Sequence, residues 1–365
     1  MVGRCARIQS AQDRLGQMET VVREKIAVLG AGAIGSSVGA DLIKAGHDVV
    51  LIDQWPAHVE AMKASGLRVV MSDEDLHVPV RAYHLCDVST LNQQFDIVLL
   101  GSKSYDTCWM AQLIKPYLKT DGMLAGLQNG MNDESIAAIV GYSRTVGCVV
   151  ELSAEVFTPG VVQRNTTRQS TWFAFGELHG RLTPRLRKLN EIMNCSAKIS
   201  LTSNIWGAKW AKLINSTMIL SVFGMLGLQS WEATDIPGVF KLCIKVGRET
   251  MAVGKALGYT IEPIFGFTAE EFDGSTDEIV EKLLRAVLGH LGPNARKARG
   301  VVLQDYHKGR LTEVDFLTGV VVKKGREASV STPANEAVQH INQQIRRGAL
   351  KPDRSNLALV EKMLK

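Results

Sequence analysis

A glycine-rich turn, GAGAIG at residues 30–35, limits what this chain can fold into more than any other feature. It follows a short apolar run, KIAVL, and precedes a stretch with helical spacing, so it joins a predicted buried strand to a predicted helix. Gly30 allows the tight turn, Gly32 lets a diphosphate approach the backbone, and Gly35 lets helix and strand pack closely. The helix N-terminus then offers free N–H groups to phosphates. The predicted dinucleotide-binding residues are Gly30, Ala31, Gly32, Ala33, Ile34 and Gly35.

An acidic residue closes the second predicted strand, DVVLID. It is Asp53, eighteen residues beyond Gly35, where a carboxylate can accept hydrogen bonds from the adenosine ribose hydroxyls. Such a carboxylate repels a 2′-phosphate, and the next residue is the neutral Gln54. NAD(H) is therefore the preferred cofactor. NADP(H) stays open because Arg68 or His58 could fold back toward this position.

Strands and helices alternate through the first half of the chain, which predicts a doubly wound α/β sheet. We expect strands at 25–30, 48–53, 95–103, 122–130 and 145–152, with helices such as 36–46, 106–118 and 132–140. Residues 160–165 and 171–178 read as antiparallel strands, 183–194 as a helix and 197–204 as a last strand.

Beyond residue 204 nearly every segment has helical spacing. The expected helices are 205–228, 237–257, 276–290, 295–307, 311–327 and 333–346. We therefore divide the chain into an N-terminal extension (1–23), a Rossmann domain (24–204) and a helical domain (205–365), with a cleft between the two domains.

Composition excludes several classes of protein. Lys and Arg number 42 and Asp and Glu 37, and this excess of five is too dispersed to predict nucleic-acid binding. No run reaches the ~20 apolar residues of a membrane span, and residues 1–23 lack the apolar core of a signal peptide. The six scattered cysteines form no CxxC and read as reduced thiols of a cytoplasmic protein, and the eight histidines suggest no metal site.

Several motifs in this order resemble the ketopantoate reductase (2-dehydropantoate 2-reductase) family. They are KIAVLGAGAIG, GSKSYDT (101–107), LQNGMNDE (127–134), KWAKLINS (209–216), LQDYHKGRLTEVDFLTG (303–319) and TPANEAV (332–338). The resemblance implies a Rossmann domain followed by an all-helical domain like that of 6-phosphogluconate dehydrogenase. It also implies pantothenate biosynthesis as the setting, and hydride transfer between a nicotinamide and the 2-oxo/2-hydroxy carbon of a small acid.

The same resemblance suggests roles for individual residues. Lys212 matches the general acid that protonates the substrate oxygen, and Glu313 matches the acid that holds the substrate hydroxyl. Lys103 and Asn129 match cofactor-binding residues at the carboxyl ends of strands. Each of these residues has an alternative without a functional role. For Lys212 it is a surface lysine, and for Glu313 a salt bridge on a helix. For Lys103 it is a solvated lysine, and for Asn129 an asparagine in a turn.

The substrate-facing positions depart from the family pattern. The family has asparagines four and eight residues after the catalytic lysine, where this chain has Ser216 and Leu220. Asn215 is one position away and, with Ser216, is our candidate for binding substrate. The family serine before LQD is missing at Gly300–Val301, and Arg299 is our candidate for a substitute that binds the carboxylate of the substrate.

Three hypotheses follow from the sequence. The first is a reductase of the ketopantoate reductase type, and the second is an NAD-linked dehydrogenase of a different hydroxy acid. The third is a dinucleotide-binding regulator without turnover, although the presence of Lys212 and Glu313 counts against it. We expect a small carboxylate substrate, a homodimer as a candidate assembly, and no nucleic-acid or membrane partner.

Overall fold

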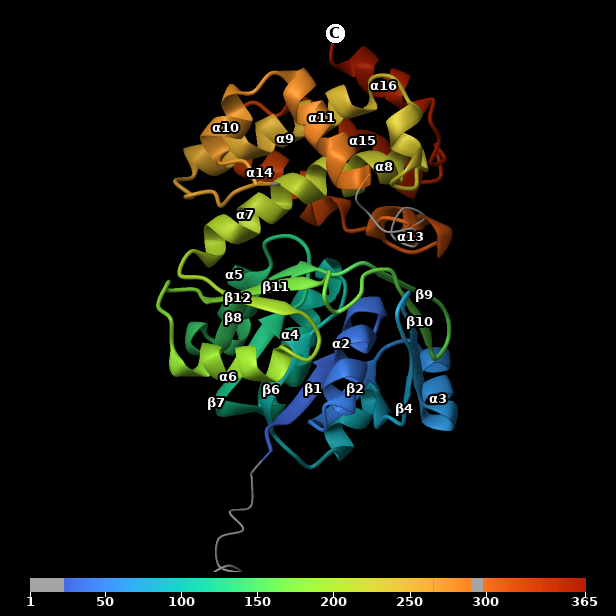
Figure 1. Cartoon of the computed structure of the whole chain (residues 1–365), viewed down its shortest axis with the longest axis vertical. Helices are drawn as coiled ribbons and strands as arrows, with labels where there is room; N and C mark the ends of the chain where they lie inside the picture. The colour runs from blue at the N-terminus through green and yellow to red at the C-terminus, as the bar shows by residue number, and fades with distance from the viewer. Residues whose placement is uncertain (1–22, 265, 290–297) are drawn as a thin grey trace, which may run out of the picture.

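A computed structural model describes residues 23–264, 266–289 and 298–365, and it consists of an α/β domain and a helical domain (Figure 1). The predicted extension lies almost wholly outside the described residues. Within the described ranges, no helix is long and apolar enough to cross a membrane.

An eight-stranded sheet forms the centre of the first domain. Neighbouring strands are parallel except for β8 and β11, which are antiparallel. In order across the sheet the strands are β12 (Lys198–Leu201), β11 (Trp172–Glu177), β8 (Thr145–Glu151), β7 (Leu118–Gly126), β6 (Phe95–Leu100), β1 (Lys25–Leu29), β2 (Asp48–Asp53) and β5 (Ala82–His84).

Both faces of this sheet are covered by apolar cores, which explains why its strands are continuous apolar runs. Along β1, Ile26 and Val28 belong to one core, whereas Ala27 and Leu29 belong to the other. The covering helices are α2 (Ala33–Lys44), α3 (Pro56–Ser65), α4 (Thr107–Ile114), α5 (Asp133–Val140) and α6 (Pro184–Met193).

A second sheet of four short strands packs beside α2. Of its strands the sequence indicated only 160–165, and that strand pairs with β9 in the antiparallel and with β3 in the parallel direction. The two segments read as antiparallel strands, 160–165 and 171–178, therefore belong to different sheets. The four strands are β4 (Asp75–Val78), β3 (Leu67–Val70), β10 (Val161–Arg164) and β9 (Ala154–Thr158).

The second domain is helical, as expected. Asn204 begins it by accepting a hydrogen bond from the Gly207 N–H at the first turn of α7, a helix-capping contact. The helices are α7 (Ile205–Ser216), α8 (Val222–Leu226), α9 (Val239–Ala256), α10 (Ala269–Gly274), α11 (Asp277–Gly289), α13 (Val301–His307), α14 (Thr318–Glu327), α15 (Pro333–Arg346) and α16 (Asn356–Met363).

Two expected helices differ from the structure. The segment predicted as one helix over 311–327 contains a non-helical stretch, then a short 3₁₀ turn (Val314–Phe316), and becomes α-helical only at Thr318. Glu313 therefore lies in the connection before this turn rather than on a helix. Of the helix predicted over 295–307, residues 295–297 lie outside the described part, and the described helix begins at Val301.

Candidate active site

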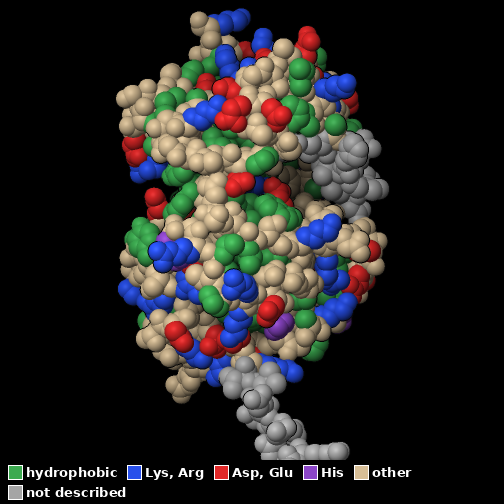
Figure 2. Space-filling view, turned by 60° about the vertical axis from the view of Figure 1, so that its left-hand side comes forward, with side chains coloured by type: hydrophobic (Ala, Val, Ile, Leu, Met, Phe, Trp, Pro, Cys, Tyr) green, Lys and Arg blue, Asp and Glu red, His purple; other side chains and the backbone are tan. Residues whose placement is uncertain are grey.

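The candidate site is a cavity of about 1310 Å³ between the two domains. Figure 2 shows the surface hollowed between the two halves of the molecule. The cavity is lined by residues at the carboxyl ends of β1, β2, β6, β7 and β8, and by α7 and the segment around α13. An open α/β sheet binds its ligands at this edge.

The glycine turn lines the cavity and has the geometry that the sequence predicts. Gly30 has φ +88°, which favours glycine, and a Cβ on it would lie 2.4 Å from the Ser102 backbone nitrogen. A Cβ on Gly35 would lie 2.2 Å from the Gly30 carbonyl oxygen. A Cβ on Gly32 would meet no protein atom within 4 Å, because this glycine borders the cavity. The turn thus leaves open the space that a dinucleotide diphosphate requires.

The carboxylate of Asp53 lies at the end of β2 and borders the same cavity. Burial raises its pKa to about 6, although the Trp55 N–H donates a hydrogen bond to it at 2.8 Å and Arg310 lies close enough to oppose the shift. The two cations considered as 2′-phosphate ligands are engaged elsewhere. Arg68 forms an exposed ion pair with Asp75, and His58 is buried against the Ala31 carbonyl oxygen.

Glu313 is held by residues of the first domain. Lys103 donates a hydrogen bond to its Oε2 at 3.1 Å, and the Ser104 N–H and hydroxyl donate to its Oε1 at 3.0 and 2.8 Å. Burial alone would raise the pKa of Glu313, but Lys103 and the Ser104 hydrogen bonds outweigh it and lower the pKa. Lys103 also donates to Asp305 Oδ2 at 2.9 Å. This network keeps Glu313 an ionised acceptor at the cavity wall.

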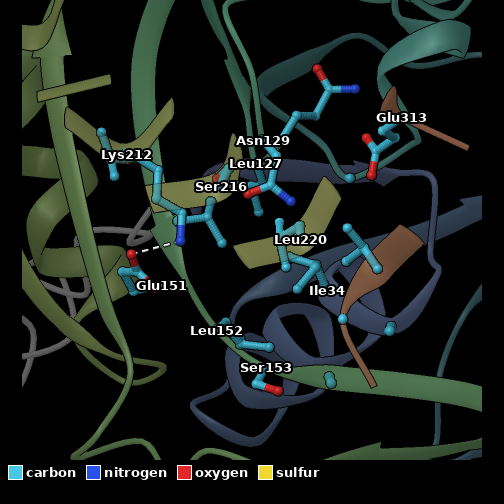
Figure 3. Close-up of a pocket in the computed structure, with 18 of the residues that line it drawn as sticks. Ile34, Leu127, Asn129, Glu151, Leu152, Ser153, Lys212, Ser216, Leu220 and Glu313 are labelled. Atoms are coloured by element: carbon cyan, nitrogen blue, oxygen red, sulfur yellow. Dashed lines mark hydrogen bonds and ion pairs between the residues drawn. The ribbon is translucent and has the colours of Figure 1, made fainter. Parts of the chain in front are cut away.

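Lys212 points into the cavity from α7, and its ammonium donates a hydrogen bond to Glu151 Oε1 at 2.6 Å (Figure 3). The lysine side chain is 16% exposed and its carboxylate partner 43%. If Lys212 and Glu313 act on one substrate, as their family counterparts imply, the two side chains should approach each other. Both residues line the cavity, but each has a different charged partner, and Figure 3 shows them on opposite sides of the labelled group.

Asn129, Asn215 and Ser216 also line the cavity, as the sequence suggests. The side chain of Ser216 is buried, and its hydroxyl has no hydrogen-bond partner among the described residues. A buried hydroxyl without a partner is costly, so a ligand group that bonds to it would be favoured.

The positions that depart from the family pattern form an apolar part of the wall. Leu220 and Val301 both border the cavity, together with Ile219 and Ile264. A Cβ on Gly300 would lie 3.3 Å from Leu220 Cδ2, so the two departures from the family pattern are neighbours in space.

Arg299 borders the cavity but is less available than expected. Its Nη1 donates to Glu155 Oε2 at 3.2 Å, and its guanidinium lies 5.4 Å from the centroid of the Phe157 ring. A substrate carboxylate would have to compete with Glu155 for this arginine.

Several residues in or beside the cavity were not assigned a role by sequence reasoning. Asp305, in the motif LQD, does not line the cavity itself, but its buried carboxylate pairs with Lys103, which does. Glu151 is the last residue of an apolar strand, and an acidic residue at such a strand end is a sequence pattern that indicates a site residue. Trp55 and Lys308 carry no local sequence signal. The described residues hold no cluster of three or more His, Cys, Asp or Glu placed to bind a metal.

Two family models match the chain. The model described as "Ketopantoate reductase PanE/ApbA" matches residues 26–178, and "Ketopantoate reductase PanE/ApbA C terminal" matches residues 204–346. A 2-dehydropantoate 2-reductase of Pyrococcus horikoshii is 28% identical over 85% of this chain and 94% of its own.

Solved structures agree with these matches. A PanE/ApbA family ketopantoate reductase from Ralstonia eutropha has a TM-score of 0.74 and 26% identity, covering 89% of this chain and 99% of its own. A D-mandelate dehydrogenase solved with NADH and anilino(oxo)acetate has a TM-score of 0.76 with the same coverage, and its 20% identity supports the fold alone. The chain therefore belongs to the ketopantoate reductase family of NAD(P)-dependent oxidoreductases that act on CH–OH groups.

Proposed function

We propose that this protein is an NAD(H)-preferring oxidoreductase that interconverts a small 2-oxo acid and its 2-hydroxy acid. The observation that carries the proposal is that one cavity joins the glycine turn, with the open side of Gly32, to the Lys212 ammonium. A bound nicotinamide dinucleotide would supply or accept the hydride.

Other residues that line the cavity have the chemistry that carbonyl reduction requires. As hydride reaches the carbonyl carbon, negative charge grows on the oxygen, and Lys212 is placed to stabilise that charge and donate a proton. Glu313, kept ionised by Lys103 and Ser104, is placed to accept a hydrogen bond from a substrate hydroxyl. Asn215 and Ser216 complete the proposed substrate contacts, whereas Lys103 and Asn129 border the proposed cofactor path.

The preference for NAD(H) rests on Asp53. Its buried carboxylate faces the cavity, while Arg68 and His58 are engaged elsewhere. Dissociation constants for NADH and NADPH test this: the wild type should bind NADH more tightly, and Asp53→Ala should narrow the difference. Tenfold tighter binding of NADPH by the wild type would contradict the assignment.

A second candidate keeps the chemistry and changes the substrate to a hydroxy acid with an apolar side chain. The apolar wall formed by Leu220, Val301 and Ile219 favours it over an acid with a polar side chain. Assays at 340 nm with a panel of 2-oxo and 2-hydroxy acids, each with both cofactors, distinguish the two candidates. A kcat/KM for ketopantoate within the usual enzyme range of about 10⁴–10⁸ M⁻¹s⁻¹ would favour ketopantoate, whose side chain is polar, as the substrate. No turnover with any acid would favour the regulator. The homodimer stays a prediction.

A further inference from the structure

Lys308 is a cation in the cavity that the proposed reaction leaves without a role. It follows the last turn of α13, in the helical domain, and its partly buried side chain lines the same cavity as Gly30 and Gly32. Its ammonium lies 4.5 Å from the centroid of the Phe157 ring on β9. The side chain therefore crosses from the helical domain to the α/β domain.

Lys308 differs from the other cations of the cavity in its partners. Lys103, Arg299 and Arg310 each contact a carboxylate. In the described part of the chain, no carboxylate oxygen lies within 4.0 Å of the Lys308 ammonium. Burial, with the charges of Arg310 and Lys103, lowers its pKa to about 8, so it is mostly charged at neutral pH. The carboxylates of Asp305 and Glu155 oppose this shift, but they are already paired with Lys103, Arg310 and Arg299. An anionic ligand would therefore stabilise the partly desolvated ammonium of Lys308.

The charge of Lys308 acts on His58, a residue that contacts the glycine turn. This charge is one of the causes that lower the pKa of His58, after burial of the ring. His58 Nε2 lies 3.0 Å from the carbonyl oxygen of Ala31, inside the glycine turn, and its Nδ1 accepts a hydrogen bond from the Gly160 N–H between β9 and β10. The ammonium of Lys308 and the N-terminus of α2 are thus two positive features of the same cavity.

We propose that Lys308 binds the diphosphate of the nicotinamide dinucleotide and completes, from the helical domain, the anion site that the glycine turn begins. The inference rests on the proposed use of such a cofactor. A lysine suits this role because its ammonium acts as a compact point charge toward phosphate oxygens. Lys212 and Arg299 remain the cations for the substrate.

The test is the affinity of Lys308→Met for three ligands, measured by titration calorimetry. We expect the dissociation constants of NADH and of ADP-ribose, which carry the diphosphate, to rise at least tenfold. The dissociation constant of adenosine, which has no phosphate, should not change. Lys308→Arg should recover part of the affinity, and the loss should shrink as salt concentration rises. Lys323→Met, on the exposed face of α14, removes the same charge away from the cavity and should bind like the wild type.

Three results would overturn the proposal. In the first, Lys308→Met binds NADH within twofold of the wild type, whether or not the KM of an acid substrate changes. In the second, only NADPH is weakened, which would place Lys308 at the 2′-phosphate. In the third, Lys308→Arg, which keeps the charge, is as weak as Lys308→Met. Loss of NADH affinity in a protein that turns over no 2-oxo acid would support the diphosphate site and contradict the proposed reaction instead.

Discussion

Single charged residues of the cavity have their behaviour set by their partners. Lys212 is held by Glu151, whose carboxylate is 43% exposed and so joins the lysine to bulk water. This arrangement gives the proposed proton donor a route for regaining its proton after each turnover.

If Lys212 donates the proton, Lys212→Ala should lower kcat by about 10²–10⁴-fold. The dissociation constant of NADH should barely change, because Lys212 pairs with Glu151 rather than with a residue of the glycine turn. Stopped-flow reduction with the best acid of the panel measures the first quantity and fluorescence titration the second. A loss smaller than tenfold would remove Lys212 from the chemistry.

The raised pKa of Asp53 predicts that NADH affinity depends on pH. The free protein protonates this carboxylate as pH falls through about 6, and a protonated carboxyl accepts ribose hydrogen bonds less well. NADH affinity should therefore weaken by about tenfold from pH 7 to pH 5, whereas a loss above about pH 8 would belong to Lys308, which gives up its proton there. Asp53→Asn should bind weakly with little dependence on pH, and this variant separates Asp53 from His58, whose pKa burial lowers. Equal pH dependence in both proteins would contradict the prediction.

At the scale of elements, the helix that carries Lys212 does not continue regularly. After α7 the chain makes a π-turn at Thr217–Ser221 before α8 begins, and Leu220 lies within this turn. A π-turn shifts the face that later residues present, so spacing on a regular helix does not describe the positions beyond Ser216.

Leu220→Asn combined with Val301→Ser should restore polar groups to the apolar wall. We expect kcat/KM for ketopantoate, relative to an acid with an apolar side chain, to rise at least tenfold. Leu220→Met keeps the wall apolar and is the matched control. An unchanged ratio would show that these positions do not set substrate preference.

The sequence predicts some elements well for a physical reason. The strands β1, β2, β6, β7 and β8 are buried on both faces, so they read as apolar runs, and α15 has the expected bounds. The sequence does not indicate β3, β4, β5 and β9, because each mixes polar with apolar residues and so forms no continuous apolar run. At the site, the glycine turn and Asp53 follow from local sequence. The links Lys103–Asp305, Lys212–Glu151 and Lys308–Phe157 join distant segments, and no local pattern predicts them.

At the scale of the whole molecule, charged pairs join the domains on both flanks of the cavity. Lys209 of α7 forms an ion pair at 2.7 Å with Asp133 of α5, and both side chains are almost wholly buried. Lys209 also donates to the Cys148 carbonyl oxygen at 3.0 Å. On the other flank, Asp305 pairs with Lys103 and Arg299 with Glu155.

Lys209→Met should destabilise the protein by about 3–5 kcal/mol, because it leaves the Asp133 carboxylate buried without a partner. The free energy of unfolding in urea measures this. Replacing both charges, in Lys209→Met/Asp133→Leu, should recover most of the loss. A single variant within about 1 kcal/mol of the wild type would show that water or a rearranged side chain replaces the lysine.

The Lys209–Asp133 pair also bears on how this protein could be recombined with its relatives. Asp133 and Lys209 come from different domains and are both buried, so each domain depends on the other for the counter-charge of its buried residue. In a chimera whose helical domain has no cation at position 209, the Asp133 carboxylate would be buried without a partner. A hybrid joined at Asn204 takes residues 133 and 209 from different parents, so it should keep its full stability only when these two residues still form a pair of opposite charges.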